Sequence, residues 1–368
     1  MDLVYFSPVN WISFEQRPHK FVRWYHSKYG AQVLWVDPYP TRLPSLKDVY
    51  RLGSKENITS SSELNWLKVV NPGGLPIEPL PGSSVVNGLF WKKIMHELDQ
   101  FAKDESVIFG VGKPSLLSLK ALRQHGSLFS FYDCMDNFPS FYSGVSRISM
   151  DLREKQLADR VNHIMVSSSF LVNKFKQYNR KISLVLNACD SAGLPSISSI
   201  DKVQESAVLG YVGMINDWFD WQLLIGLAES NPSYCVRLIG PVQVPCQKTL
   251  PSNVEMLPAC RHSLAIEAMS KFSVGLIPFK LNELTETVDP IKYYEYRGLG
   301  LPVLSSKFGE MAVRNEQDGV FFMSAESDLQ KAVREAVLYK AADDDVNIFR
   351  EENSWSHRFN SIDFLPTH

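Results

Sequence analysis

Short apolar runs alternate with longer amphipathic stretches along the first half of the chain. Each run is bounded by polar or turn-forming residues, which is typical of the buried strands of a parallel sheet. The intervening stretches are long enough for helices, and a strand, a helix and a second strand at this spacing open a parallel α/β sheet. The apolar runs lie at 3–6, 32–36, 107–112 and 128–132, at the start of 163–175, and within 182–190.

The same alternation restarts in the second half, after a stretch at 191–206 that is rich in Ser, Pro and Gly. Such composition favours a linker. The 368 residues suit about two domains of ordinary size. We therefore predict two α/β domains, at 1–190 and 207–345. The expected strands of the second lie at 208–216, 234–240, 254–257, 274–279 and 301–305.

The stretch from Thr287 to Ser306 combines a helix with a strand. Asp289 is a candidate helix cap, and Pro290 suits the first turn, where a missing N–H costs nothing. The spacing predicts a helix from Pro290 to about Arg297, ended by the glycines that follow and continued by a short buried strand.

The first turn of this helix is a candidate phosphate site. Its unpaired N–H groups and the helix dipole attract anions, and Lys292 adds a positive charge. Glu295 lies one turn on, and its carboxylate accepts hydrogen bonds as ribose hydroxyls require. Alternatively, Lys292 and Glu295 form a surface ion pair that contributes about 0.2–0.5 kcal/mol, and the neighbouring tyrosines pack the helix.

Two acidic residues follow the apolar run at 128–132. Asp133 and Asp136 leave the carboxyl end of an expected strand, where open α/β sheets place ligands. Both are expected to meet solvent or a ligand, since an unpaired buried carboxylate is costly. They could instead cap the next turn. Arg17, at the start of an early helix, is interpreted as a contact to an acceptor or a phosphate, or as a solvated charge.

The expected helix at 17–29 mixes basic and aromatic residues. Such a mixture suits a membrane surface. A half-buried helix with solvated lysines explains it equally, with Phe21, Trp24 and Tyr25 inside. Residues 40–90 hold many Pro, Gly and Ser and are interpreted as long connections, with a flap as a further interpretation.

Composition narrows the class of protein. The net charge of −2 gives no reason to expect nucleic acid as a partner. The five cysteines are odd in number and lack metal-type spacing, which favours free thiols. No signal peptide and no apolar run long enough for a membrane span is evident, so we expect a cytoplasmic protein. No motif requires a cofactor or a metal, and a divalent ion loosely held on donor phosphates stays open.

Several segments resemble one family of enzymes. PIKYYEYRGLGLPVLSS is similar to the P-x-K-x-x-E-Y-x-x-x-G-x-P-V segment of nucleotide-sugar glycosyltransferases of the GT-B type, particularly family 4 and its teichuronic-acid and O-antigen relatives. EQRPHKF, LWVDP and YDCMDN resemble further segments of these relatives. The resemblance covers about three quarters of the chain and is weakest over 40–100. It implies an α/β protein with two Rossmann-like domains facing across a cleft, and a tail helix within 346–368 that returns to the first domain.

The resemblance also implies a donor site. The residue matching Glu295 binds the donor ribose, and the start of its helix faces the donor diphosphate. The implied donor-binding residues are Glu295, Lys292, Gly213, Pro290, Ile291 and Arg261, with Arg17 for acceptor or phosphate. Two departures matter: the segment 214–221 has no basic residue, and Thr287 stands where the family often has a glutamate.

The function implied by the resemblance is transfer of a sugar from a nucleotide sugar to a hydroxyl of a growing, lipid-linked bacterial surface glycan, with retention. The chain would work in the cytoplasm or at the inner face of the membrane, with Asp133 or Asp136 acting on the acceptor hydroxyl or on the transition state. Two alternatives stay open: a sugar-nucleotide epimerase or hydrolase on the same fold, and a non-catalytic GT-B-like subunit of a polysaccharide assembly complex.

Overall fold

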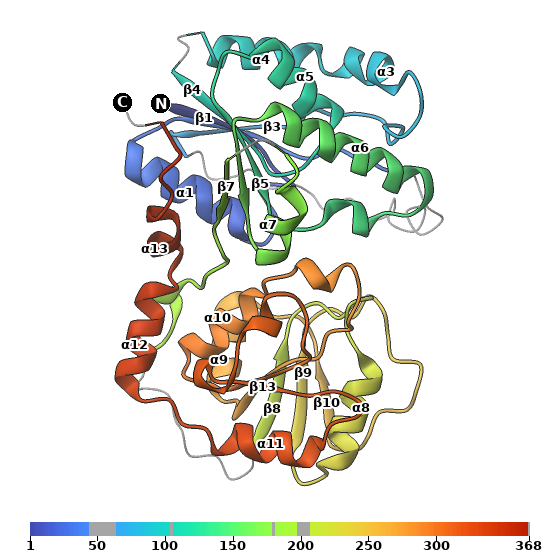
Figure 1. Ribbon diagram of the computed structural model, residues 1–368, viewed down its shortest axis with the longest axis vertical. Coiled ribbons are helices and arrows are strands. Elements are labelled where there is room, and N and C mark those ends of the chain that lie inside the picture. The colour runs from blue at the N-terminus through green and yellow to red at the C-terminus, as the bar shows by residue number, and fades with distance from the viewer. Residues whose placement is uncertain (44–63, 104–105, 179–180, 197–206, 367–368) are drawn as a thin grey trace. The chain divides into compact units, whose positions relative to one another are not determined.

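The computed structural model describes residues 1–43, 64–103, 106–178, 181–196 and 207–366. The chain forms two α/β units, each built around one parallel sheet (Figure 1). The first unit comprises Met1–Val185 and Ile362–His368, and the second comprises Leu186–Ser361. The predicted α/β class with two Rossmann-like domains is confirmed.

The first sheet has the strand order β3-β2-β1-β4-β5-β6-β7, and every neighbouring pair is parallel. Its central strands are continuous apolar runs because helices cover both faces. The elements are β1 Asp2–Phe6, α1 Arg17–Tyr29, β2 Val33–Val36, β3 Leu67–Val70, α3 Ser83–Phe90, α4 Lys92–Phe101, β4 Val107–Val111, α5 Leu116–Gln124, β5 Ser130–Cys134, α6 Gly144–Arg160, β6 His163–Val166, α7 Ser169–Phe175 and β7 Lys181–Leu184.

Alternate residues of these strands face different helices. On one face, Phe21 of α1 packs against Tyr5 and Phe131, with ring centroids 5.8 and 5.6 Å apart. The other face packs under α4 and α5, where Val4 and Phe6 join the main hydrophobic cluster of this unit. Phe21, Trp24 and Tyr25 of α1 are therefore core residues, so the membrane interpretation of 17–29 is wrong and the half-buried one is confirmed.

The region 40–90 differs from expectation. Its second half contains β3, which pairs with β2, and the helix α3, while 44–63 lies outside the described residues. The interpretation as long connections is therefore wrong for this half. The periodicity was weak because β3 is a short edge strand and α3 buries only Ser83 and Asn87.

The second sheet has the order β10-β9-β8-β11-β12-β13 and is also parallel throughout. Asp220 and Asp328 begin two of its helices, since their side chains accept the N–H of the third helical residue. The elements are β8 Val208–Val212, α8 Trp221–Ser230, β9 Cys235–Ile239, β10 Val254–Leu257, α9 His262–Ser270, β11 Val274–Ile277, α10 Ile291–Gly298, β12 Val303–Ser305, β13 Val320–Phe322, α11 Leu329–Leu338, α12 Asp343–Glu352 and α13 Trp355–Asn360.

The tail is divided between the units. Helices α12 and α13 belong to the second unit, where Arg350 donates to the carbonyl oxygen of Gly298 at 2.6 Å. The segment from Ile362 belongs to the first unit, and it reaches the sheet through Phe364, whose ring stacks on His163. The segment that returns to the first unit is therefore not helical. The first unit ends at Val185, a few residues before the predicted boundary at 190.

The packing of β8 generates a stability prediction. A Cβ at Gly210 would lie 2.1 Å from the ring of buried Phe272, so Gly210→Ala should displace that ring and cost about 1–3 kcal/mol of unfolding free energy. Gly226→Ala in α8 is the matched control, because its nearest neighbour would be Leu329 at 3.6 Å. Gly226→Ala should raise the free energy of unfolding by about 0.5–1 kcal/mol, because alanine favours a helix more than glycine does. Urea unfolding measures both, and equal effects would contradict the packing described.

Candidate functional site

The helix α10 presents two polar side chains in its first two turns. Pro290 is the residue before the helix, and Ile291, Lys292 and Glu295 are half-buried. No ion pair found among the described residues includes Lys292 or Glu295. The alternative of a surface ion pair between them is therefore not observed, although their neighbours Tyr293, Tyr294 and Tyr296 are buried packing residues, as that alternative expected.

Lys292 lies against the turn that follows β8. A Cβ at Gly213 would be 2.3 Å from Cε and 2.9 Å from Nζ of Lys292, so a larger residue there would displace the end of this lysine. Gly213 also has φ +146°, a conformation that favours glycine. The ammonium of Lys292 lies 6.0 Å from the ring centroid of Tyr211. The structure thus brings together Gly213 and Lys292, two of the predicted donor-binding residues.

A second glycine completes this turn. Gly240 lies directly after β9, and a Cβ added there would be 2.1 Å from the carbonyl oxygen of Gly213. The backbones of the two glycines are therefore in close contact. Two parallel strands therefore end in side-chain-free backbone beside the start of α10. This combination of open backbone, helix N–H groups and one ammonium suits an anionic ligand. Sequence reasoning noted Gly240 only as the end of a strand.

Glu295 lies near the segment that enters the second unit. Burial raises the pKa of the Cys189 thiol to about 12, and the Glu295 carboxylate adds to this shift. The backbone N–H of Cys189 donates a hydrogen bond to the carbonyl oxygen of Asn353. Its sulfur lies close to α10, 3.6 Å from where a Cβ at Gly298 would be. The thiol is consequently protonated at neutral pH and serves as packing beside Glu295.

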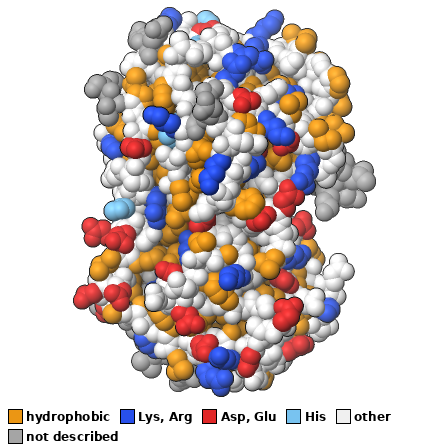
Figure 2. Space-filling model, in the orientation of Figure 1, with side chains coloured by type: hydrophobic (Ala, Val, Ile, Leu, Met, Phe, Trp, Pro, Cys, Tyr) orange, Lys and Arg blue, Asp and Glu red, His pale blue; other side chains and the backbone are white. Residues whose placement is uncertain are grey.

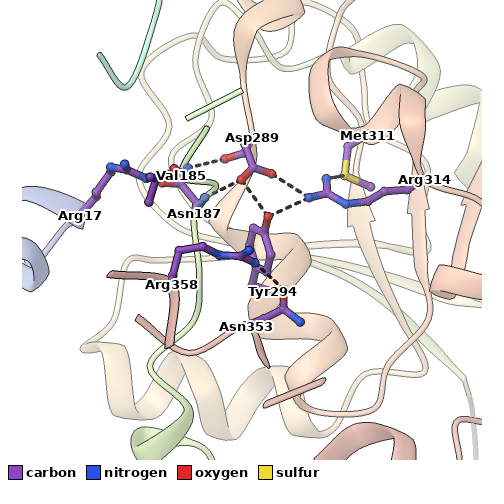
Figure 3. Close-up of polar contacts among 9 residues, drawn as sticks. All are labelled: Arg17, Val185, Asn187, Asp289, Tyr294, Met311, Arg314, Asn353 and Arg358. Carbon is purple, nitrogen blue, oxygen red and sulfur yellow. Dashed lines mark hydrogen bonds and ion pairs between the residues drawn. The ribbon is translucent and has the colours of Figure 1, made fainter. Parts of the chain in front are cut away.

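Asp289 holds the loop that leads into α10 (Figure 3). Its carboxylate accepts hydrogen bonds from the N–H of Asn187 at 2.7 Å, the hydroxyl of Tyr294 at 2.8 Å and the guanidinium of Arg314 at 2.8 Å. Arg314 also lies over the ring of Tyr293, 3.8 Å from its centroid. Asp289 therefore does not cap the helix as predicted. Its carboxylate is buried and is turned toward these three donors instead.

The same network fixes the neighbouring chain segments. The side-chain amide of Asn187 donates to the carbonyl oxygen of Asp289 at 2.6 Å, which pairs the two residues twice. Burial raises the pKa of the Tyr294 phenol well above its usual range, and the Asp289 carboxylate raises it further, so this hydroxyl stays a donor. Arg314 was missed at the sequence level because an arginine in a polar loop carries no distinguishing pattern.

In the first unit, Arg17 and Asp133 form a buried ion pair. Arg17 Nε lies 3.2 Å from Asp133 Oδ1, Tyr5 donates to Oδ2 at 2.9 Å, and Asp133 is fully buried. Arg17 also donates to the carbonyl oxygen of Val185 at 2.7 Å. The expectation that Asp133 needs solvent or a ligand is therefore wrong, because protein donors satisfy it. The alternative of Arg17 as a solvated charge is wrong as well.

Asp136 has a different environment two residues past the strand end. It is half-buried, and burial raises its pKa to about 7 although Arg17 opposes the shift. Its loop is held by Ser167, which donates to the carbonyl oxygen of Met135 at 2.7 Å, and by Lys174, which donates to Asn137 at 2.7 Å. A carboxyl group that titrates near neutrality in a braced loop suits acid–base chemistry. Asp133 is neutralised by Arg17, so Asp136 is the better candidate of the two predicted catalytic residues.

The remaining predicted residues are less informative. Arg261 is exposed before α9, and no interaction that joins it to Lys292 is seen in the described ranges. Thr287 is fully buried and donates to the carbonyl oxygen of Leu284 at 3.3 Å, so it serves packing. Within the described residues there is no group of three or more His, Cys, Asp or Glu side chains that could hold a metal ion. Of the described helices, none is long and apolar enough to cross a membrane.

Comparison with curated proteins finds a glycosyltransferase. No family model matches the chain. A teichuronic acid biosynthesis glycosyltransferase of Bacillus subtilis (strain 168), described only provisionally under the name TuaH, is 25% identical over 206 residues. The match covers 49% of this chain and 52% of that protein, so the chain spans about half the length of its curated relative.

Comparison with solved structures covers nearly the whole chain. Sucrose-phosphate synthase from Thermosynechococcus elongatus matches 98% of this chain and 94% of its own, with a TM-score of 0.66 and 11% identity. For Anabaena HepE in complex with UDP and glucose, the match covers 98% of both chains, with a TM-score of 0.66 and 12% identity. For the lipopolysaccharide outer core galactosyltransferase WaaB, the match covers 98% of both chains, with a TM-score of 0.58 and 12% identity. The chain therefore has the fold of the GT-B glycosyltransferases, and the resemblance noted in the sequence is confirmed.

Proposed function

We propose that the protein is a glycosyltransferase that moves a sugar from a nucleotide-sugar donor to a hydroxyl of a glycan. The observation that carries this proposal is the position of Lys292, whose ammonium has no ion-pair partner in the described part of the chain and lies beside Gly213 at the start of α10. An unneutralised ammonium beside the first N–H groups of a helix is suited to a diphosphate. The curated relative and the UDP complex of HepE support the same class of ligand.

The donor would be held at both ends by α10. Lys292 and the first N–H groups of the helix bind the diphosphate, and Glu295 accepts hydrogen bonds from the ribose hydroxyls. The same donors stabilise the negative charge that develops as the nucleotide diphosphate leaves. The buried Asp289 network keeps the start of the helix in place, so these groups are oriented before the donor arrives.

The acceptor would be deprotonated or oriented by Asp136. We propose a growing, lipid-linked bacterial surface glycan as the acceptor and retention of the anomeric configuration, in the cytoplasm at the inner face of the membrane. The names of two relatives, which refer to teichuronic acid and to the lipopolysaccharide outer core, support the glycan class. No step of this scheme requires a cofactor, and Lys292 would supply charge that a divalent ion supplies elsewhere.

A second candidate function is a non-catalytic subunit that binds a nucleotide sugar. It is favoured by two observations: 214–221 contains no basic residue, and Thr287 is buried where the related enzymes often have a glutamate. Incubation with UDP-, GDP- and TDP-sugars, with and without a lipid-linked saccharide, separates the candidates. Acceptor-dependent nucleotide release supports transfer, acceptor-free release indicates an epimerase or hydrolase, and binding without release indicates the subunit.

Glu295→Gln tests the donor site. The substitution keeps the shape of the side chain but weakens charge-assisted hydrogen bonds of about 1.5–3 kcal/mol each, so the Kd for UDP should rise at least tenfold. Isothermal titration calorimetry measures this change, and Glu286→Gln, at an exposed position before the same helix, is the matched control. An unchanged Kd in Glu295→Gln would remove Glu295 from the donor site.

Asp136→Asn tests the catalytic assignment. Loss of a positioned acid or base should lower kcat by about 100-fold or more, while the Kd for UDP stays near that of the wild type. Asp159→Asn, at an exposed position on α6, controls for loss of a charge in the same unit. Asp133→Asn should instead unfold at a lower temperature, because it breaks a buried ion pair. Full transfer activity in Asp136→Asn would refute the assignment.

The raised pKa of Asp136 also predicts how stability depends on pH. Its pKa of about 7 in the native state lies above the unfolded value of about 3.9, so the native state binds more protons between these values. The contribution of this carboxyl is fully present below pH 4 and is lost as the pH rises through 7. Asp136→Asn should therefore gain stability relative to the wild type at pH 8 and lose that gain toward pH 4, which urea unfolding across this range measures.

A further inference from the structure

The helix α3 is oriented with its polar side inward. Asn87 is fully buried; its side chain accepts the N–H of Leu75 at 2.8 Å and donates to the carbonyl oxygen of the same residue at 3.1 Å. Ser83, one turn earlier, is buried and donates to the carbonyl oxygen of Glu78 at 3.0 Å. Hydrogen bonds to a loop therefore hold this helix on the first unit. An amphipathic helix is ordinarily held by burial of its apolar residues instead.

The apolar residues of α3 point outward as a consequence. Val85, Val86, Leu89 and Phe90 are 73, 41, 64 and 50% exposed. Leu75 and Leu80 in the adjoining loop are also exposed, and Leu80 accepts a hydrogen bond from the N–H of Ser83. We call these six side chains the α3 face. Figure 2 shows hydrophobic side chains gathered at the edge of the first unit, where Figure 1 places α3.

Three lysines lie close to the α3 face. Lys92 and Lys93 begin α4, one residue after α3 ends, and are exposed. Nζ of Lys120 would lie 3.9 Å from a Cβ at Gly88 of α3. The sequence from 79 to 96 contains no Asp or Glu. Among the ion pairs formed by described residues, none neutralises these three lysines. A partner of this surface must therefore accept apolar side chains and also carry negative charge.

We propose that the α3 face docks onto the surface of a lipid bilayer that contains anionic lipids. The exposed aliphatic and aromatic side chains enter the boundary between headgroups and acyl chains, and Lys92 and Lys93 meet the anionic headgroups. The polar contacts of Ser83 and Asn87 explain why the helix stays folded against the protein while its apolar side leaves water. This surface is separate from α1, whose Phe21, Trp24 and Tyr25 are buried.

Vesicle sedimentation of the full chain tests the proposal. Wild-type protein should bind vesicles of phosphatidylcholine and phosphatidylglycerol more tightly than vesicles of phosphatidylcholine alone. Leu89→Gln/Phe90→Gln should lower the partition coefficient at least tenfold on both vesicles, because it removes the largest apolar side chains. Lys92→Gln/Lys93→Gln should lower it about 25-fold on the anionic vesicles only, since each lysine near such a surface contributes about fivefold.

Leu338→Gln/Ile348→Gln is the matched control, because it removes two exposed apolar side chains from the second unit and should leave binding unchanged. Vesicle binding that is absent in the wild type, or that survives Leu89→Gln/Phe90→Gln, would overturn the proposal. A wild-type dimer that this variant converts to monomer without any vesicle binding would assign the α3 face to a second copy of the chain instead. The vesicles contain no sugar or nucleotide, so the result is independent of the proposed glycosyl transfer.

Discussion

The buried carboxylate of Asp289 is the interaction on which the candidate donor site depends. An unpaired carboxylate in this position would be costly, and three donors from separate segments satisfy it: the backbone at Asn187, the phenol of Tyr294 and the guanidinium of Arg314. Because Asp289 directly precedes Pro290, these contacts fix the point where α10 starts. The orientation of Lys292 and Glu295 follows from that starting point, and the glycine turns after β8 and β9 are shaped to accept it.

Arg17, Asp133 and Asp136 show how one loop separates a structural acid from a reactive one. Asp133 is still on the strand and faces Arg17 and Tyr5, so its charge is neutralised inside the protein. Asp136 has left the strand, and no donor to its carboxylate is seen among the described residues. Its carboxyl titrates near neutral pH because burial disfavours the charge. Two acids three positions apart therefore differ in chemistry because Asp133 has a buried ion-pair partner while burial raises the pKa of Asp136.

The sequence allowed the alternation of strands and helices, the two-unit division and the position of α10 to be predicted, because each depends on local periodicity or on flanking proline and glycine. The ion pair of Arg17 could not be predicted, since its partner lies 116 positions away. Arg314 is likewise 25 positions from Asp289. The helix α3 was missed for a different reason: periodicity identifies a helix when its apolar side is buried, and in α3 that side faces outward. Pairing across the chain and exposure of an apolar side are both decided by tertiary structure.

The anchoring of the chain where it passes from one unit to the other has a mechanical consequence. The carbonyl oxygen of Val185 is held by Arg17 of the first unit, and the N–H of Asn187 is held by Asp289 of the second (Figure 3). Leu186 alone separates these two anchors. The chain passes back only once more, between Ser361 and Ile362. A single residue of backbone therefore lies between these two hydrogen bonds, and loss of either bond would lengthen that stretch.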